Sequence, residues 1–212
     1  MKWEDFIKIA GKLPIVNKKL FLPGASSVNA VEVQFSRWQK TGKLIQLKRG
    51  MYLLAEPYRK IDLFEPYVAS ALISPSYISL EKALEYHDLI PEGVSVYTSV
   101  TTKRQGKFIT KVGVYDYRHI KSSLFWGYKT VCMNKQTAFI ASPEKALLDF
   151  FYLKKIRVTL DYLNEMRLQN VEKIDLDILV QYAKRYDKKS LFDAVRMIEK
   201  YIVRYKKDEK TL

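Results

Sequence analysis

Residues 29–54 constrain the fold of this chain more than any other segment of its sequence. Val31, Phe35 and Trp38 recur at helical spacing, and the positions between them are mostly polar. This period predicts an amphipathic helix over residues 29–41 with a single apolar face. Such a helix is stable only when that face packs on a core, so this segment must fold against other elements.

The ends of this helix and the residues after it carry further signals. Asn29 followed by Glu32 matches a capping box, and Gly42 suits the left-handed conformation that often ends a helix. Two β-prone runs then lie within residues 44–54, separated by a turn that contains Gly50. This arrangement predicts a β-hairpin directly after the helix.

The order of elements in the first quarter of the chain predicts a winged helix-turn-helix. Residues 3–10 show helical periodicity, and residues 17–22 fit one short helix before the longer helix and its hairpin. Glu56-Pro57 then breaks the pattern. We therefore expect two domains, residues 1–57 and residues 58–212.

The second part mixes helical and strand-like patterns. Its strand-like runs are residues 94–100, 108–117, 124–133 and 138–141. Its helical patterns are residues 62–73, 80–87, 144–153, 160–168, 176–186 and 190–205. We expect an α+β protein in which the N-terminal winged helix-turn-helix precedes a larger mixed α/β domain that ends in helices.

The charge balance favours an anionic partner. The chain has 37 Lys and Arg against 23 Asp and Glu, a net charge of +14. Such a surplus attracts polyanions, of which nucleic acid is the most common. A basic protein from an AT-rich genome, whose codons favour Lys, would show the same surplus, so charge alone does not decide.

Composition also predicts the compartment. With a single cysteine, Cys132, the chain cannot form an intramolecular disulfide. Cys132 lies in an apolar run, which predicts a buried thiol. Residues 1–10 do not resemble a signal peptide, and no run approaches the roughly 20 apolar residues of a membrane helix. We expect a cytoplasmic protein with no membrane partner.

The outward face of the helix over residues 29–41 is the strongest candidate site. A helix in the major groove needs polar and basic side chains on the face opposite the core. Arg37 can donate two hydrogen bonds to one guanine. The predicted DNA-binding residues are those of this face and the basic residues of the hairpin: Asn29, Val33, Ser36, Arg37, Lys40, Lys43, Lys48 and Arg49. The alternative is an ordinary solvated helix face.

Enzymatic and metal sites find little support in the sequence. His87 and His119 are far apart, and neither a nucleophile elbow nor a glycine-rich phosphate loop occurs. The string that begins at Ser142 looks reactive, but it also fits a capped helix start in which Lys145 pairs with Asp149. We therefore expect no catalytic residues, no metal and no cofactor.

Three ordered motifs resemble a known family. They are Lys43-Leu44-Ile45 with Leu47–Leu53, then Pro75–Leu84, then Ala141–Asp149. Together they resemble the AbiEi family, the antitoxins of type IV toxin–antitoxin (abortive infection) systems. The resemblance covers residues 3–153, and the short segment over residues 17–22 departs from the family pattern.

The resemblance implies a function as well as a fold. Family members have an N-terminal winged helix-turn-helix that binds inverted repeats in their own promoter and represses it. A larger C-terminal domain counteracts a co-encoded nucleotidyltransferase-like toxin, and the proteins are not enzymes. Carried over by position, residues 29–41 are the recognition helix and residues 43–54 are the wing. Self-association on DNA is an accompanying expectation.

Two alternatives stay open at the level of sequence. A winged helix can bind protein instead of DNA, which would make the chain an interaction module or a general regulator without a toxin partner. A cluster of basic residues near the C-terminus could also extend the DNA footprint or form a solvated face: Arg196, Lys200, Arg204, Lys206, Lys207 and Lys210.

Overall fold

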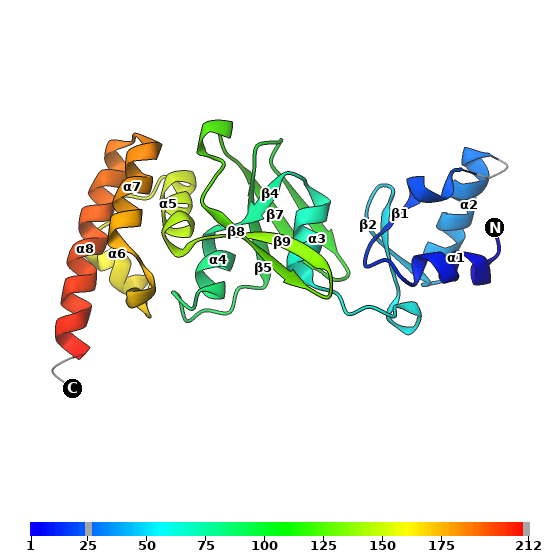
Figure 1. Ribbon diagram of the computed structural model, residues 1–212, viewed down its shortest axis with the longest axis horizontal. Coiled ribbons are helices and arrows are strands. Elements are labelled where there is room, and N and C mark those ends of the chain that lie inside the picture. The colour runs from blue at the N-terminus through cyan, green and yellow to red at the C-terminus, as the bar shows by residue number, and fades with distance from the viewer. Residues whose placement is uncertain (24–26, 210–212) are drawn as a thin grey trace.

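The chain extends along one axis, with the two termini at opposite ends of the molecule (Figure 1). This computed structural model describes residues 1–23 and 27–209, with side chains described up to Tyr205. The side chains of Lys206, Lys207 and Lys210 therefore lie outside the described residues.

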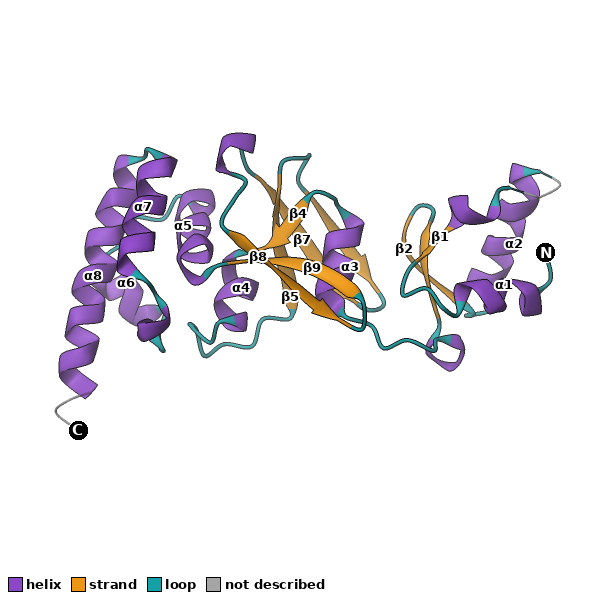
Figure 2. Cartoon of the chain, in the orientation of Figure 1, coloured by secondary structure: helices purple, strands orange, loops and turns teal. Residues whose placement is uncertain are grey.

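Helices and strands alternate irregularly along the chain, which is an α+β protein (Figure 2). The helices are α1 Trp3–Ala10, α2 Val28–Lys40, α3 Glu65–Leu72, α4 Leu80–Tyr86, α5 Pro143–Lys154, α6 Leu160–Glu165, α7 Leu176–Tyr186 and α8 Lys189–Glu209, with short 3-10 helices η1 Lys18–Phe21, η2 Glu56–Tyr58, η3 Ser122–Leu124 and η4 Val171–Lys173. The strands are β1 Val16–Asn17, β2 Leu44–Lys48, β3 Met51–Leu54, β4 Ser76–Ile78, β5 Val96–Thr101, β6 Gly106–Thr110, β7 Gly113–His119, β8 Tyr128–Met133 and β9 Gln136–Ala141.

The N-terminal unit packs α1 and α2 on an antiparallel sheet of order β1-β3-β2. Its core is rich in aromatic residues. The Phe6 ring lies 4.4 Å from the Trp38 ring, 4.9 Å from Phe21 and 5.5 Å from Phe35, measured between centroids. Large rings in mutual contact bury much apolar area, which compensates for the small size of this unit.

The helix and hairpin predicted for residues 29–54 are present, but the predicted N-cap is wrong. Ser27 caps α2, because its Oγ accepts a hydrogen bond from the backbone N–H of Ala30 at 3.1 Å. Glu32 is bound instead by Lys18, with 2.7 Å between Nζ and Oε1. Gly42 has φ of +72°, the left-handed backbone predicted for it, and Gly50 in the hairpin turn has φ of +80°.

The segment over residues 17–22 is less regular than predicted. Val16 and Asn17 pair with β3, and only the next four residues form the 3-10 helix η1. The Asn17 side chain caps η1 by accepting from the Lys19 backbone N–H at 3.0 Å. One chain segment therefore serves both the sheet and the entry to α2.

The second unit is built on a six-stranded sheet of order β6-β7-β5-β4-β9-β8. The pairs β4–β9 and β5–β7 are parallel, and the other neighbours are antiparallel. The Tyr117 hydroxyl donates to the Ala69 carbonyl of α3 on one face. The Tyr77 hydroxyl donates to Asp149 of α5 on the other face at 2.9 Å. Helices thus cover both faces of the central strands.

Several predicted boundaries in this unit were wrong. The run over residues 108–117 is two strands joined by a turn at Lys111-Val112, not one strand. The strand β4 was not predicted, and α3 begins at Glu65 instead of residue 62. Cys132 is exposed, not buried, because its strand β8 lies at the edge of the sheet.

The hairpin β2–β3 belongs to both units. Leu44, Tyr52 and Leu54 join the aromatic core of the N-terminal unit. Leu47 and Leu53, which are 5% and 0% exposed, join the larger core of the second unit. The hairpin is therefore apolar on both faces, and the predicted boundary at residue 57 remains a prediction.

Helices α6, α7 and α8 form the far end of the molecule (Figure 1). Leu163, Leu179 and Ile198 are fully buried and extend the larger core to this end. Within the part of the chain that the structure describes, no helix is both long enough and apolar enough to cross a membrane.

Candidate nucleic-acid interface

The outward face of α2 brings together the residues that the sequence singled out. Five predicted side chains are exposed on this helix: Asn29, Val33, Ser36, Arg37 and Lys40. At 3.6 residues per turn these positions fall within an arc of roughly 100° around the helix axis. They form one continuous strip opposite the buried face.

The buried face holds this strip in position. Val31, Phe35 and Trp38 are at most 6% exposed and pack in the aromatic core. The Gln39 side chain donates to the Gln46 side chain of β2 at 3.1 Å, which ties the end of the helix to the hairpin. The helix is therefore a rigid support for the side chains that it presents to solvent.

The three basic residues around the hairpin lie in different surroundings. Arg49 is exposed, and it is close enough to Glu32 to help Lys18 hold the pKa of that carboxyl below its usual value. The Lys43 ammonium lies 4.8 Å from the centre of the Trp3 ring, a cation–π distance.

Lys48 points toward the second unit instead of solvent. Its ammonium donates to the backbone carbonyl of Leu72 at the end of α3. Burial, with a smaller contribution from the charge of Lys103, lowers the pKa of Lys48. In this structure Lys48 joins the two units, and Arg49 and Lys43 are the basic side chains of the hairpin region that lie free of such a bond.

A cavity next to α2 adds a residue that the sequence did not single out. It has a volume of about 430 Å³ and opens between α2, β2 and the β6–β7 turn. Ser36 and Lys40 line one side, and Lys111 of the turn lines the other. Lys111 is exposed. No sequence signal marks Lys111 as a site residue, because the pattern over residues 108–117 predicts one continuous strand through it.

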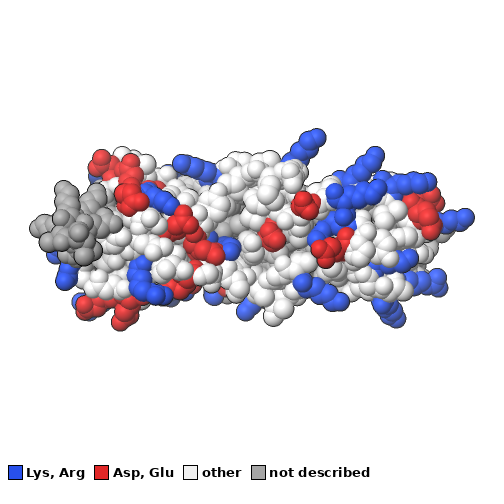
Figure 3. All heavy atoms as spheres, turned by 90° about the horizontal axis from the view of Figure 1, so that it is seen from below, with Lys and Arg blue, Asp and Glu red and all other residues white. Residues whose placement is uncertain are grey.

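The basic surplus is visible at this end of the molecule. On the face that Figure 3 shows, Lys and Arg side chains gather over the N-terminal unit. Residues 1–57 contain ten Lys and Arg against four Asp and Glu. A field of this sign attracts phosphate from a distance, before any specific contact forms.

The string beginning at Ser142 forms the capped helix start that the sequence predicted. Ser142 Oγ accepts from the Lys145 backbone N–H at 3.3 Å, and Lys145 Nζ lies 2.6 Å from Asp149 Oδ1. The pair is not isolated, however. Tyr77 and Ser79 donate to the second Asp149 oxygen at 2.9 and 2.8 Å.

Tyr186 of α7 completes this buried cluster, which contains Tyr77, Ser79, Lys145, Asp149 and Tyr186. Its hydroxyl accepts from Lys145 and donates to Asp149. Lys145 and Asp149 are 0% exposed. Burial lowers the pKa of Lys145, against the opposing effect of Asp149, and raises the pKa of Tyr186 well above its usual value. Neither charge has any exposed surface, and the hydrogen bonds of this cluster join β4, α5 and α7.

The two histidines lie at a helix end and on the surface. His87 ends α4, and its Nε2 lies 2.8 Å from the Ala141 carbonyl. A carbonyl only accepts, so this nitrogen carries the hydrogen. His119 is exposed. Among the described residues, no three His, Cys, Asp or Glu side chains gather in a way that could hold a metal ion.

No protein-family model matches the sequence, and no curated protein matches it significantly. The resemblance to the AbiEi family therefore stays a prediction that depends on the three motifs.

Proposed function

We propose that this chain is a DNA-binding regulator whose N-terminal unit is a winged helix-turn-helix. In this proposal α2 is the recognition helix and β2–β3 is the wing. The observation that carries it is the exposed strip on α2, in which the five predicted residues lie together on a helix fixed by its aromatic core. The surplus of basic residues over this unit supports the same proposal.

Each part of the strip has a role in the proposed complex. Arg37 reads a base edge in the major groove, since its planar guanidinium can donate two parallel hydrogen bonds to guanine. Asn29 and Ser36 contact base edges or phosphates nearby. Lys40 and Arg49 contact backbone phosphates, which set the register of the helix but carry no sequence information.

The second unit supplies the antitoxin activity in this proposal. The three motifs that resemble the AbiEi family imply repression of the chain's own promoter in the cytoplasm. They also imply relief of the toxicity of a co-encoded nucleotidyltransferase-like toxin. Neither activity requires a catalytic residue, metal or cofactor in this chain.

Fluorescence anisotropy with the full chain tests the DNA-binding role. The probes are a duplex from the region upstream of the gene and a shuffled duplex of the same composition. Arg37→Ala should cost about 1–3 kcal/mol on the upstream duplex and much less on the shuffled one. Lys184→Ala is the matched control, because Lys184 is exposed on α7 at the other end of the molecule.

Two results would contradict this role. Equal losses on both duplexes would make Arg37 a phosphate contact. Equal binding of both duplexes by the unchanged chain would favour the alternative in which the N-terminal unit binds protein.

Co-expression tests the antitoxin role separately. The full chain is expressed beside the neighbouring open reading frame, and growth is scored with and without Arg37→Ala and Lys40→Ala together. We expect the double variant to lose repression and keep rescue. If neither form rescues growth and the neighbour is not a nucleotidyltransferase, the family assignment is wrong, whatever the DNA result.

A further inference from the structure

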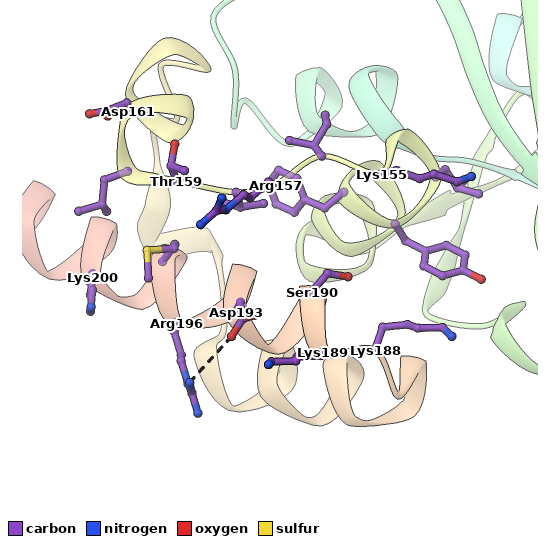
Figure 4. A pocket seen from close by; sticks show the side chains of 17 residues that line it. Lys155, Arg157, Thr159, Asp161, Lys188, Lys189, Ser190, Asp193, Arg196 and Lys200 are labelled. Carbon is purple, nitrogen blue, oxygen red and sulfur yellow. Dashed lines mark ion pairs between the residues drawn. The ribbon is translucent and has the colours of Figure 1, made fainter.

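A large groove lies at the C-terminal end of the molecule, far from α2 (Figure 1). It has a volume of about 1320 Å³ and opens between the end of α5, residues 155–161 and the first half of α8 (Figure 4). This exceeds the roughly 300–1,000 Å³ of pockets that take a drug-sized molecule. The groove therefore suits a segment of a macromolecule better than a small ligand.

The rim of this groove is strongly basic. Six cationic residues line it, and all are exposed: Lys155, Arg157, Lys188, Lys189, Arg196 and Lys200. The two acidic residues of the lining are Asp161 and Asp193. Arg196 reaches Asp193 at 3.9 Å, and no other rim cation forms an ion pair among the described residues. Most of the positive charge is thus left without a counter-charge.

The base of the groove is apolar. Phe151 and Val158 are buried there, and Ile156, Leu160 and Met197 are partly exposed at its surface. A basic rim around an apolar base is a combination that a solvated charged face does not need. It matches an occupant with both anionic and apolar groups.

We propose that this groove binds an acidic, amphipathic helical segment of a partner protein. The carboxylates of that segment pair with the rim, and its apolar face packs on the base. Helices bind apolar grooves in this way through side chains that recur on one face. Lys189 and Lys200 are eleven residues apart on α8, a distance of roughly 16 Å, so the rim matches about three turns of a partner helix.

Nucleic acid fits the same groove less well. Bases of a single strand need exposed aromatic faces on which to stack. The aromatic residues of this lining are engaged, with Phe151 2% exposed and Tyr152 packed against Tyr186. A duplex presents its phosphates on a convex surface and leaves an aliphatic base uncovered. The apolar base therefore favours protein.

A designed peptide tests this proposal on the full chain. The probe is a labelled peptide of about 18 residues with Leu at helical spacing and Glu at the remaining positions. The triple variant Arg157→Glu, Arg196→Glu and Lys200→Glu should weaken binding of this peptide at least about tenfold. The rim charges attract the peptide carboxylates and determine the position of the peptide along the groove. Met197→Gln should also weaken binding, about threefold or more, without any change of charge.

A second triple variant controls for net charge. Arg104→Glu, Lys107→Glu and Lys121→Glu change the charge equally at exposed positions outside the groove. We expect this control to weaken peptide binding less than about twofold at physiological salt, since distant charges are screened. Thermal melting of every variant establishes that a loss of binding does not reflect unfolding.

Three results would overturn the proposal. The first is equal weakening by both triple variants, which would indicate general charge attraction. The second is equal binding of a peptide with the same composition in shuffled order. This would show that the apolar base does not recognise an apolar helix face. The third is an oligothymidine strand that displaces the peptide and is itself lost in the groove variant, which would make the groove a nucleic-acid site.

Discussion

Lys145 and Asp149 are two opposite charges in the middle of an apolar core. The Lys145 Nζ atom lies 2.6 Å from the Asp149 Oδ1 atom. Three hydroxyl groups also donate hydrogen bonds to the carboxylate, those of Tyr77, Ser79 and Tyr186. A paired buried charge adds little net stability, but an unpaired one is very costly. The main effect of the pair is therefore to fix the position of α5 against the sheet and α7, and its net contribution to the free energy of unfolding is small.

Removal of one partner should show this asymmetry. Lys145→Met leaves an uncompensated buried carboxylate and should lower the free energy of unfolding by about 3–5 kcal/mol. Lys145→Met combined with Asp149→Leu should cost clearly less, because no charge then remains buried. Urea denaturation of Lys145→Met, Asp149→Leu and the double variant measures the difference. A double variant as unstable as the sum of the single ones would contradict a coupled pair.

His87 should make the stability of the protein sensitive to mild acid. Burial lowers the pKa of His87 in the folded chain, and the Ala141 carbonyl opposes this shift. The unfolded state has a His pKa of about 6.5, so it binds the proton first as the pH falls. The stability that neutral His87 provides is therefore complete above about pH 6.5 and is lost as the pH falls from there through the folded pKa.

His87→Gln should flatten this loss, because a glutamine side chain keeps a donor and does not titrate. The measurement is the free energy of unfolding in urea from about pH 7 to about pH 5, above the window in which carboxyl groups titrate. His119→Gln is the control, since His119 is exposed. An unchanged pH profile in the His87 variant would mean that this residue does not couple folding to protonation.

The hairpin β2–β3 shows how one element can serve two tasks. Both of its basic turn residues are predicted DNA-binding residues, yet the Lys48 ammonium bonds to Leu72 in the second unit. Each phosphate contact contributes roughly 0.9 to the slope of log affinity against log salt. Arg49→Ala should therefore flatten that slope by about one unit, and Lys48→Ala should leave it nearly unchanged.

Anisotropy titrations at several salt concentrations measure these slopes. Lys48→Ala should instead lower thermal stability, because it frees the Leu72 carbonyl at the contact between the units. If Lys48→Ala flattens the slope as much as Arg49→Ala does, the hairpin must turn toward DNA when it binds.

The predictability of each element depended on how local its signal was. The helix α7 was predicted to the residue, since its apolar period and the turn after Tyr186 are both local signals. The strand β4 was not predicted, because its three residues after Pro75 are all buried and show no alternation of buried and exposed positions. Lys111 and Val112 do not mark a turn by residue type, so β6 and β7 were read as one strand.

In the candidate site, too, the residues with a local sequence signal could be predicted and the others could not. The exposed face of α2 could be predicted, because its buried residues define its orientation. The N-cap of α2 was not predicted correctly: Ser27 caps the helix in place of Asn29, and Glu32 pairs with Lys18. The contacts of Lys48, Lys111 and the basic groove depend on chain segments distant in sequence, which no local pattern reveals.

At the scale of the whole molecule, the two candidate surfaces lie at opposite ends. The strip on α2 faces outward from the N-terminal unit, and the basic groove lies among α5, α6 and α8 (Figure 1). The six-stranded sheet separates them. DNA and a protein partner could therefore be bound at the same time without competing for one surface.

The shared hairpin leads to a prediction about how independent the two units are. The Glu56-Pro57 boundary suggests that residues 1–57 could fold alone, but Leu47 and Leu53 pack in the core of the second unit. A fragment of residues 1–57 would expose both side chains, and burying a Leu is worth about 1.5–3 kcal/mol. A unit of this size has little stability to lose.

We therefore expect residues 1–57 alone to melt at a lower temperature and less cooperatively than the full chain, as measured by circular dichroism. Replacing Leu47 and Leu53 by Thr in the fragment should reduce its self-association, because the newly exposed face becomes less apolar. The same two changes in the full chain should destabilise it by about 2 kcal/mol or more, because they open cavities in the larger core. A fragment that melts cooperatively at the temperature of the full chain would instead show that the units are independent.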